Sequence, residues 1–410
     1  MITTKTFLFV SIDGMTDPLG QSQVLPYLVN LAKKGYKIGI ISCEKKDNWE
    51  LNSSTIKGIV SKANIKWNYC FYKNSTPIIS QVQNYLSLKK LVLNEVKKNV
   101  NHTVLHCRSY IPGLIGLYSK KIFNTGFIFD MRGFWADERV EGGIWNKNSF
   151  IGSYLYSYFK KKEKEMLISS DYIISLTHKA KEIILDWKLF SNSSKITVIP
   201  CCVDLIHFSQ DNINQKIVLD LKEKFPQLIN KFIISYIGSL GTWYMADEML
   251  SFFKILSKKT DSIFLIITKD HIDLIHHAAK KANVDLNKLI VISSSRKDIP
   301  SYISISSASI FFIKPIFSKS ASSPTKMGEL LSMSIPIITN KGIGDVDAII
   351  TDTQCGVTIT NFTNESYEVA IDDLLGNKLS YKNNTINAAN KHFSLKEGVE
   401  KFDLVYQKFI

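Results

Sequence analysis

The chain has 410 residues, of which 45% are hydrophobic and 21% are charged, a balance that predicts an ordinary globular protein of two domains and excludes a disordered chain. Residues 1–200 hold 28 Lys and Arg against 15 Asp and Glu, a net charge of +13, whereas residues 201–410 hold 23 and 22, a net charge of +1. The basic excess indicates an anionic partner for the N-terminal half, such as a membrane surface, a phosphate-bearing lipid or nucleic acid.

The first 42 residues predict a strand, a helix and a second strand. Residues 6–12 form a short apolar run without the cleavage site of a signal peptide, residues 24–34 are apolar at helical spacing, and residues 36–42 are again apolar. Such a unit forms a parallel sheet, and ligands bind beyond the carboxyl ends of its strands. The segment MTDPLGQSQ is expected to be a turn. Its Gly20 and Gln21 either let the backbone approach a ligand or form a simple flexible connection.

The alternation continues through the N-terminal half and is typical of a doubly wound α/β fold. The expected strands are 104–107, 126–130, 171–175 and 195–199, and the expected helices are 80–98 and 111–122. No apolar run approaches the roughly 18 to 20 residues that span a bilayer. The six cysteines lack the spacing of metal ligands. We therefore expect a cytoplasmic protein with reduced thiols.

Two of these strands end in ionisable side chains, at the edge of the sheet where a ligand would bind. His106 and Arg108 close one strand, and Asp130 and Arg132 close the next. They are candidates for a functional site; a buried core histidine and a structural Asp–Arg pair are the alternatives.

The next two segments have an unusual composition. FWADERVEGGIW, with Asp137, Glu138 and Arg139, is too polar and too rich in glycine for a core and is predicted to be a functional loop. Residues 150–169 combine aromatic residues with lysines. This helix is either an interfacial membrane anchor or a packed helix with a solvated basic end.

A polar run around residues 205–215 predicts a domain boundary. We expect an N-terminal domain at 1–207, a C-terminal domain at 208–385, and a helical segment at 386–410 that packs back towards the N-terminal domain. The second domain is also expected to be α/β, with strands at 232–237, 262–268, 289–293, 308–313 and 335–339 and a helix at 247–258.

The segment SASSPTKMGELLSMSIP follows one of these strands and is predicted to open a helix, with Ser323 or Thr325 as its N-cap. Together with Ser322, these residues form a plausible anion cradle, because a helix N-terminus carries free N–H groups and a positive dipole end. Lys326 adds a positive charge. Glu329 lies one turn further on the same face, where its carboxylate can accept hydrogen bonds from sugar hydroxyls. The alternative is a capped surface helix with a Lys/Glu pair.

Taken in order, the glycine-containing loop near Gly20, the HCR segment, FDMRGFWADE, VIPCCVDLIHF, YIGSLGTW and SSPTKMGELLSMSIPII resemble the retaining GT-B glycosyltransferases of family 4. Those enzymes build bacterial surface polysaccharides. The resemblance covers roughly residues 5–345. It implies two Rossmann-like domains that face each other across a cleft, and a hexosyltransferase activity (EC 2.4) on a nucleoside-diphosphate sugar.

The resemblance also implies roles for single residues. Glu329 resembles the second glutamate of the family's E-x7-E motif, which holds the nucleotide ribose, but the first glutamate falls at Ala321 and the motif is broken. The usual diphosphate-binding Arg and Lys fall near Ser239 and Tyr244. We therefore expect Lys326 to bind the diphosphate.

The expected functional residues fall into three groups: donor-binding, catalytic and acceptor-binding. Donor binding is assigned to Lys326, Glu329, Ser322, Ser323, Thr325, Gly238, Ser239, Gly20 and Gln21, catalysis to Asp130, Arg132 and His106, and acceptor binding to Arg108, Asp137, Glu138 and Arg139. No metal and no other cofactor is expected. The expected acceptor is a lipid-linked saccharide at the inner face of the cytoplasmic membrane, in capsule, O-antigen or lipopolysaccharide assembly.

Two rival functions are also compatible with the sequence. A sugar-nucleotide epimerase on the same fold would bind the same donor, and a non-catalytic partner subunit would explain the replaced family residues. A nucleic-acid partner rests on charge alone and is not expected.

Overall fold

The computed structural model describes residues 5–410 and divides into two compact units. The N-terminal unit comprises Met1–Pro200 together with Leu395–Ile410, and the C-terminal unit comprises Cys201–Ser394. The chain therefore leaves the first unit after Pro200 and returns to it at Leu395, where the sequence placed the boundaries after residues 207 and 385.

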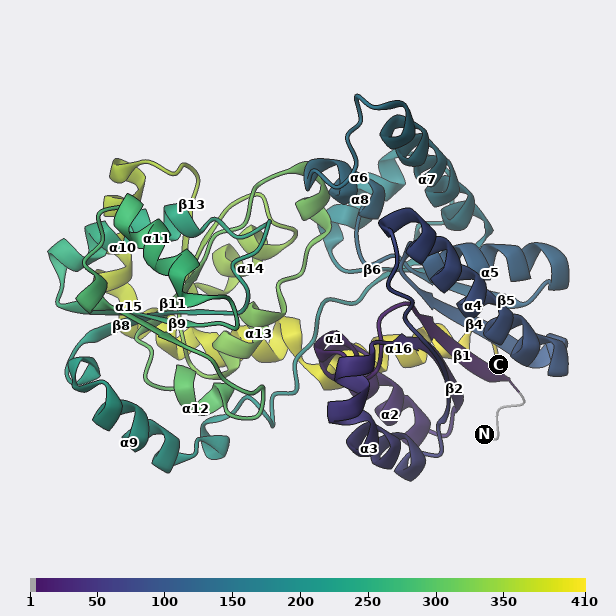
Figure 1. Cartoon of the computed structure of the whole chain (residues 1–410), viewed down its shortest axis with the longest axis horizontal. Helices are drawn as coiled ribbons and strands as arrows, with labels where there is room; N and C mark the ends of the chain where they lie inside the picture. Colours follow the sequence, from purple (N-terminus) through teal and green to yellow (C-terminus); the bar gives the residue numbers. More distant parts are fainter. Residues whose placement is uncertain (1–4) are drawn as a thin grey trace. The chain divides into compact units, whose positions relative to one another are not determined.

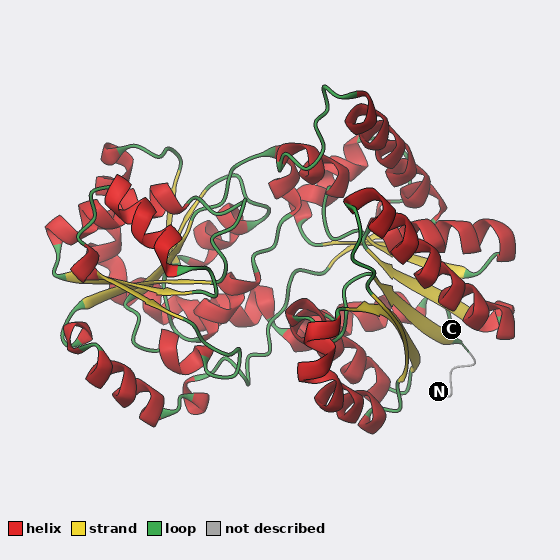
Figure 2. Cartoon of the chain, in the orientation of Figure 1, coloured by secondary structure: helices red, strands yellow, loops and turns green. Residues whose placement is uncertain are grey.

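The N-terminal unit is built on a seven-stranded parallel sheet with the strand order β3-β2-β1-β4-β5-β6-β7. Its strands are β1 (Thr6–Ser11), β2 (Lys37–Glu44), β3 (Lys66–Phe71), β4 (Thr103–Arg108), β5 (Gly126–Asp130), β6 (Tyr172–Ser175) and β7 (Ile196–Val198). Phe9 of the inner strand β1 lies opposite Ile40 of β2 and His106 of β4. The inner strands are almost completely buried, because helices cover the sheet, as Figure 2 shows for each unit.

Nine helices belong to the described part of this unit. They are α1 (Pro18–Gln23), α2 (Leu25–Lys33), α3 (Lys46–Lys62), α4 (Pro77–Lys98), α5 (Tyr110–Phe123), α6 (Trp135–Glu141), α7 (Phe150–Ser169), α8 (His178–Asp186) and α16 (Leu395–Gln407). The C-terminal helix α16 packs against α2 (Figure 1). Its Tyr406 stacks on Phe7 of β1, with ring centroids 4.0 Å apart. These last residues therefore complete the core of the N-terminal unit.

The C-terminal unit has a six-stranded parallel sheet with the order β10-β9-β8-β11-β12-β13. Its strands are β8 (Phe232–Ile237), β9 (Ser262–Ile267), β10 (Leu289–Ile292), β11 (Ala308–Phe311), β12 (Ile337–Asn340) and β13 (Gly356–Ile359). Its helices are α9 (Gln215–Lys224), α10 (Ala246–Lys259), α11 (Ile272–Lys281), α12 (Ile299–Ile303), α13 (Thr325–Ser332), α14 (Val346–Thr353) and α15 (Asn364–Phe393). A continuous core that includes Phe252, Phe264 and Phe311 holds the helices against the sheet.

Short 3-10 turns join several of these elements. They lie at Val100–His102, Ser193–Lys195, Gln210–Asn212, Pro226–Leu228, Leu286–Lys288 and Phe317–Ala321.

Two local expectations are wrong. The segment predicted to be a turn forms helix α1, because Pro18 occupies its first position, where a missing N–H is harmless, and because Gly20 packs against the backbone of Gly14 and Met15. Neither Ser323 nor Thr325 caps α13: the N-cap is Pro324, and the hydroxyl of Ser323 instead accepts a hydrogen bond from the N–H of Cys201 at 3.1 Å.

Within residues 5–410, none of the helices combines the length and the apolar character that crossing a membrane requires.

Candidate functional site

Helix α13 places the side chain of Lys326 at the carboxyl-end edge of the sheet of the C-terminal unit. The side chain is buried, and its Nζ lies between two tyrosine rings, 3.7 Å from the ring centroid of Tyr244 and 4.1 Å from that of Tyr236. It also lies 3.3 Å from the position that a Cβ on Gly238 would occupy. A side chain at position 238 would therefore crowd the ammonium group, and the φ of +108° of Gly238 independently favours glycine.

The nitrogen of Lys326 has no hydrogen-bond partner within the described residues. Burial lowers its pKa well below 10.5, and the nearby carboxylate of Glu329 only partly opposes this effect. A buried ammonium without a hydrogen-bonding partner is costly unless an anion reaches it. The site is thus prepared for a ligand that brings negative charge.

The carboxylate of Glu329 lies one helical turn from Lys326 and is also buried. Its Oε1 is 2.8 Å from Nη1 of Arg296, which follows β10. The Arg296 guanidinium also lies over the ring of Phe208, 5.3 Å from its centroid. Segments that follow three strands therefore meet at this site. Gly238 follows β8, Arg296 follows β10, and α13 with Lys326 and Glu329 follows β11.

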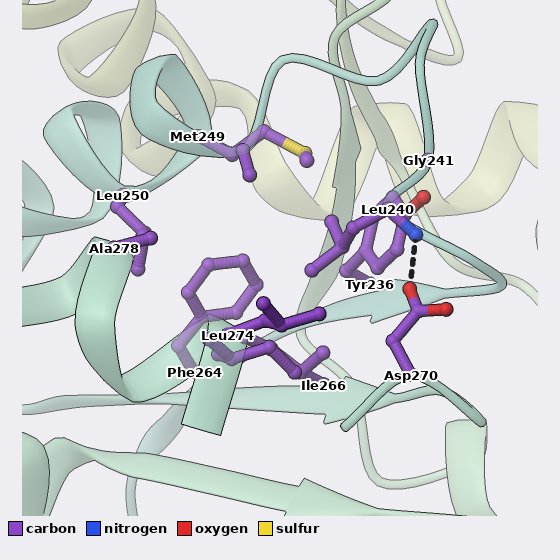
Figure 3. A pocket seen from close by; sticks show the side chains of 12 residues that line it. Tyr236, Leu240, Gly241, Met249, Leu250, Phe264, Ile266, Asp270, Leu274 and Ala278 are labelled. Carbon is purple, nitrogen blue, oxygen red and sulfur yellow. Dashed lines mark hydrogen bonds between the residues drawn. The ribbon is translucent and has the colours of Figure 1, made fainter. Parts of the chain in front are cut away.

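The loop after β8 is held in place by a carboxylate that follows β9. Ser239 donates its hydroxyl to Oδ1 of Asp270 at 2.9 Å. The N–H of Leu240 donates to Oδ2 of the same carboxylate at 2.5 Å (Figure 3). The hydroxyl of Tyr236 donates to the carbonyl of Ser239 at 2.6 Å. These bonds fix the backbone around Gly238, next to Lys326.

An apolar cavity of about 260 Å³ adjoins the same loop. Figure 3 shows its lining, in which Leu240, Met249, Phe264 and Leu274 surround an interior that Asp270 borders on one side. Apolar walls and a single carboxylate do not suit an anion. We therefore place the anion site at Lys326 and not in this cavity.

The other predicted donor residues of the C-terminal unit lie along the approach to α13. Ser322 and Thr325 are half-buried, and Ser323 is bonded to Cys201. Thr325 is the first residue of α13, whose initial N–H groups have no partner inside the helix. Ala321 is buried and contributes no polar group.

The N-terminal unit gathers charged side chains at the carboxyl ends of β4 and β5. Oδ2 of Asp130 is 3.8 Å from Nη1 of Arg108 and 3.8 Å from Nε2 of His106, and its Oδ1 is 3.8 Å from Nη1 of Arg132. Arg108 Nε also lies 3.7 Å from Asp13, which follows β1. The three predicted catalytic residues and the predicted acceptor residue Arg108 thus form one cluster.

The cluster is buried, and burial affects the protonation states of its side chains. Burial alone would raise the pKa of Asp130, but Arg132, His106 and Arg108 outweigh it, and the pKa of this carboxyl lies below its usual value. Burial lowers the pKa of His106, against the effect of Asp130. His106 Nδ1 also shares a hydrogen bond of 2.9 Å with the hydroxyl of Tyr406. The histidine is therefore neutral at pH 7, between a carboxylate and a phenol.

The backbone at this cluster is strained. Arg132 has a φ of +61°, and Gly133 follows with a φ of +137°. A left-handed conformation costs a non-glycine residue about 1 kcal/mol or more, and such residues concentrate at functional sites.

Gly20 and Gln21 lie in the N-terminal unit, and both are involved in packing. A Cβ on Gly20 would come 2.2 Å from the carbonyl oxygen of Gly14, and the Gln21 amide donates to the carbonyl of Thr16 at 2.9 Å. The preceding loop is fixed by the buried Glu44, which accepts from the N–H groups of Met15 and Thr16 at 2.8 and 3.1 Å.

The three predicted acceptor residues of α6 have different surroundings. Asp137 is buried and accepts from Tyr156 and Lys160, each at 2.9 Å. The guanidinium of Arg139 lies 4.8 Å from the ring centroid of Trp135, and burial lowers its pKa. Glu138 is half-buried.

Sequence reasoning missed Arg296, Asp270 and Glu44. Each follows or ends a strand, at β10, β9 and β2, where ionisable residues were noted only for β4 and β5. The same criterion applied to every predicted strand would have included all three residues.

Residues 220–392 match the sequence model of the family described as Glycosyl transferases group 1. This range contains Gly238, Arg296, Lys326 and Glu329. No curated protein matches the chain.

Several solved structures share the fold along almost the whole chain. A glycosyltransferase from Rickettsia africae ESF-5 has a TM-score of 0.71 at 17% identity, over 99% of this chain and 98% of that chain. Alr3699/HepE from Anabaena, in complex with UDP, has a TM-score of 0.68 at 10% identity, over 98% and 100%. WaaG, a glycosyltransferase involved in lipopolysaccharide biosynthesis, has a TM-score of 0.63 at 11% identity, over 96% and 98%.

These likenesses confirm the predicted fold of two Rossmann-like parallel-sheet domains, and the match to the family model confirms the prediction of a glycosyltransferase. The chain has the GT-B fold, and its residues 220–392 match the model of the group 1 glycosyl transferases.

Proposed function

We propose that this protein transfers a sugar from a nucleoside-diphosphate sugar, bound by the C-terminal unit, to a saccharide acceptor bound by the N-terminal unit. The observation that carries the proposal is the buried Nζ of Lys326, which has no hydrogen-bond partner among the described residues and lies beside Gly238, where a side chain would crowd it. A diphosphate would be the anionic partner that this nitrogen lacks.

The diphosphate would contact Lys326 and the N-terminal N–H groups of α13. In the family that the sequence resembles, loop residues at the positions of Ser239 and Tyr244 hold the diphosphate. Here the Lys326 nitrogen lies against the ring of Tyr244, so that a lysine from another element supplies the positive charge at this place. Glu329, oriented by Arg296, would accept hydrogen bonds from the ribose hydroxyls.

The chemical step depends on stabilising the leaving nucleoside diphosphate. Lys326 and the dipole of α13 provide positive charge without a metal ion. We propose that no metal is needed and, from the resemblance to family 4, that the anomeric configuration of the sugar is retained.

The acceptor would bind near the cluster of His106, Arg108, Asp130 and Arg132. Two guanidinium groups and the net charge of +13 over residues 1–200 suit a phosphate-bearing, lipid-linked saccharide. The fold neighbour involved in lipopolysaccharide biosynthesis supports a role in surface polysaccharide assembly, with the protein peripheral to the inner face of the cytoplasmic membrane.

A calorimetric titration with a panel of nucleoside diphosphates tests the donor site. We expect one nucleotide, with UDP as the first candidate, to bind in the presence of EDTA. Lys326→Met should weaken its binding at least about tenfold, because a charge-assisted contact is lost. Lys378→Met is the matched control, since Lys378 also lies over an aromatic ring of the same unit, 4.9 Å from the centroid of Phe232 at the start of β8.

Unchanged affinity in Lys326→Met would contradict the assigned site. The same preparation also decides between the rival functions. An epimerase would convert the sugar nucleotide without an acceptor, and a folded protein that binds no nucleotide would be a non-catalytic subunit.

A further inference from the structure

Helices α4, α5 and α7 of the N-terminal unit enclose an apolar groove that the proposed chemistry does not use. Its volume is about 710 Å³, and Tyr85, Leu114, Trp145, Leu155 and Phe159 are among the residues that line it. Helix α5 packs against both α4 and α7, and Figure 1 shows the three helices within this unit. We call this surface the α4–α5–α7 face.

The edges of the groove are apolar and exposed. Phe150 is 89% exposed and Tyr154 is 63% exposed on α7, and Val82 and Leu86 are 51% and 55% exposed on α4. Each pair is four residues apart, so its members lie on one side of their helix. An exposed apolar patch of this kind marks an interaction site.

The same face carries an excess of lysines. Residues 79–94 of α4 contain two, residues 110–123 of α5 two, and residues 150–162 of α7 three. Four of them pair with nearby carboxylates: Lys120, Lys121, Lys160 and Lys162. Among the described residues, Lys89, Lys90 and Lys161 form no ion pair and are available to a partner. The lysines lie beside aromatic rings: Lys89 Nζ is 3.6 Å from the ring centroid of Tyr118, and Lys162 Nζ is 5.8 Å from that of Tyr158. Lysines and aromatic rings around an apolar groove match the boundary between the headgroups and acyl chains of an anionic bilayer.

We propose that the α4–α5–α7 face docks the protein on an anionic lipid surface, with Phe150 and Tyr154 in the interface and Lys89, Lys90 and Lys161 at the headgroups. A second copy of the chain is disfavoured as the occupant, because a symmetric contact would bring two lysine-rich faces together. This inference rests on the proposed function, which includes a lipid-linked acceptor. Docking on the lipid surface can nevertheless be measured without sugar transfer.

Vesicle flotation tests this proposal on the full chain. Vesicles containing phosphatidylglycerol should bind the protein, vesicles of phosphatidylcholine alone should not, and about 0.5 M NaCl should weaken the binding by screening. The double variant Phe150→Ser/Tyr154→Ser should bind at least about tenfold more weakly, because two side chains no longer enter the interface. The matched control is Val369→Ser/Leu379→Ser on α15, where the side chains are 71% and 72% exposed.

The proposal is overturned if the wild-type protein does not bind phosphatidylglycerol vesicles, if the double variant binds as well as the wild type, or if the control weakens binding equally. It is also overturned if the wild type is a dimer that the double variant dissociates. The double variant should keep the wild-type melting temperature, because both side chains are exposed. Nucleotide binding measured on the same samples keeps the two questions apart: lipid binding without nucleotide binding would refute the donor site and leave the docking face intact.

Discussion

Lys326 presents a titratable nitrogen whose pKa lies well below 10.5 in the free protein because the side chain is buried. A bound diphosphate favours the charged form and raises that pKa again. Between the two pKa values, the complex holds one more proton than the free protein. Nucleotide binding should therefore take up a proton, to an extent that increases as the pH rises above the pKa of the free state.

This uptake can be measured by calorimetric titration at several pH values from about 8 upwards, where a terminal phosphate with a pKa of about 6 is already ionised and contributes no protons of its own. Titrations in two buffers with different ionisation enthalpies give the number of protons. We expect a clearly positive value in the wild type and a value near zero in Lys326→Met. If the wild type and Lys326→Met took up the same number of protons, the proton would be bound by a group other than Lys326.

Part of this site could be predicted from the sequence. The spacing of Lys326 and Glu329 is local, and helical periodicity places them on one face. Their partners Tyr236, Gly238 and Arg296 come from strand ends about 30 to 90 residues away in the sequence. Local patterns do not specify which strand ends become neighbours, because the strand order of a sheet differs from the order of strands in the chain.

At the scale of secondary-structure elements, α6 and α7 are joined by a buried ionic network. Lys160 Nζ of α7 lies 2.9 Å from Asp137 Oδ2 of α6 and 2.5 Å from Oε1 of the fully buried Glu163. Burial raises the pKa of Glu163, although Lys160 opposes the shift. The lysine therefore compensates two carboxylates and holds α6 in position.

Replacing Lys160 with methionine should lower the free energy of unfolding by about 3 to 5 kcal/mol, because buried carboxylates lose their counter-charge. The loss should grow with increasing pH, since the unpaired carboxylates then ionise. Lys162→Met is the control: Lys162 pairs with the partly exposed Glu165, and such pairs contribute about 0 to 1 kcal/mol. Urea denaturation of the two variants over a range of pH measures the loss of unfolding free energy in each variant and its dependence on pH. Equal losses would show that the network does not stabilise the fold.

The sequence predicts elements well where their apolar pattern is strong. The strands at residues 104–107, 126–130 and 232–237 are found within a residue or two, because they are buried and mostly apolar. Strand β3 (Lys66–Phe71) escaped prediction, since it is an edge strand with few aliphatic residues that is only half-buried. Helix α1 escaped because its Pro18 and Gly20 also favour turns.

At the scale of the whole molecule, α16 makes the N-terminal unit discontinuous in sequence. Removal of residues 395–410 would expose Phe7 and Tyr36, on which Tyr406 packs, and would leave His106 Nδ1 without the Tyr406 hydroxyl. Burial of one aromatic or aliphatic side chain contributes about 1.5 to 3 kcal/mol, and α16 buries several.

The truncated chain should therefore lose the unfolding transition of the N-terminal unit while the C-terminal unit keeps its own transition and its nucleotide binding. Scanning calorimetry and limited proteolysis distinguish the two units. Tyr406→Phe serves as the mild comparison, because it keeps the stacking and removes one hydrogen bond of about 1 kcal/mol. A truncated protein with both transitions intact would contradict the structural role of α16.

The discontinuity also sets the order in which the chain can fold during synthesis. Residues 201–394 form a contiguous unit that can fold while translation continues. The first 200 residues leave the ribosome earlier, yet their unit lacks α16 until residues 395–410 have been synthesised. The unit that is synthesised first is therefore completed last, and its unfinished core must be kept from aggregating while the rest of the chain is translated.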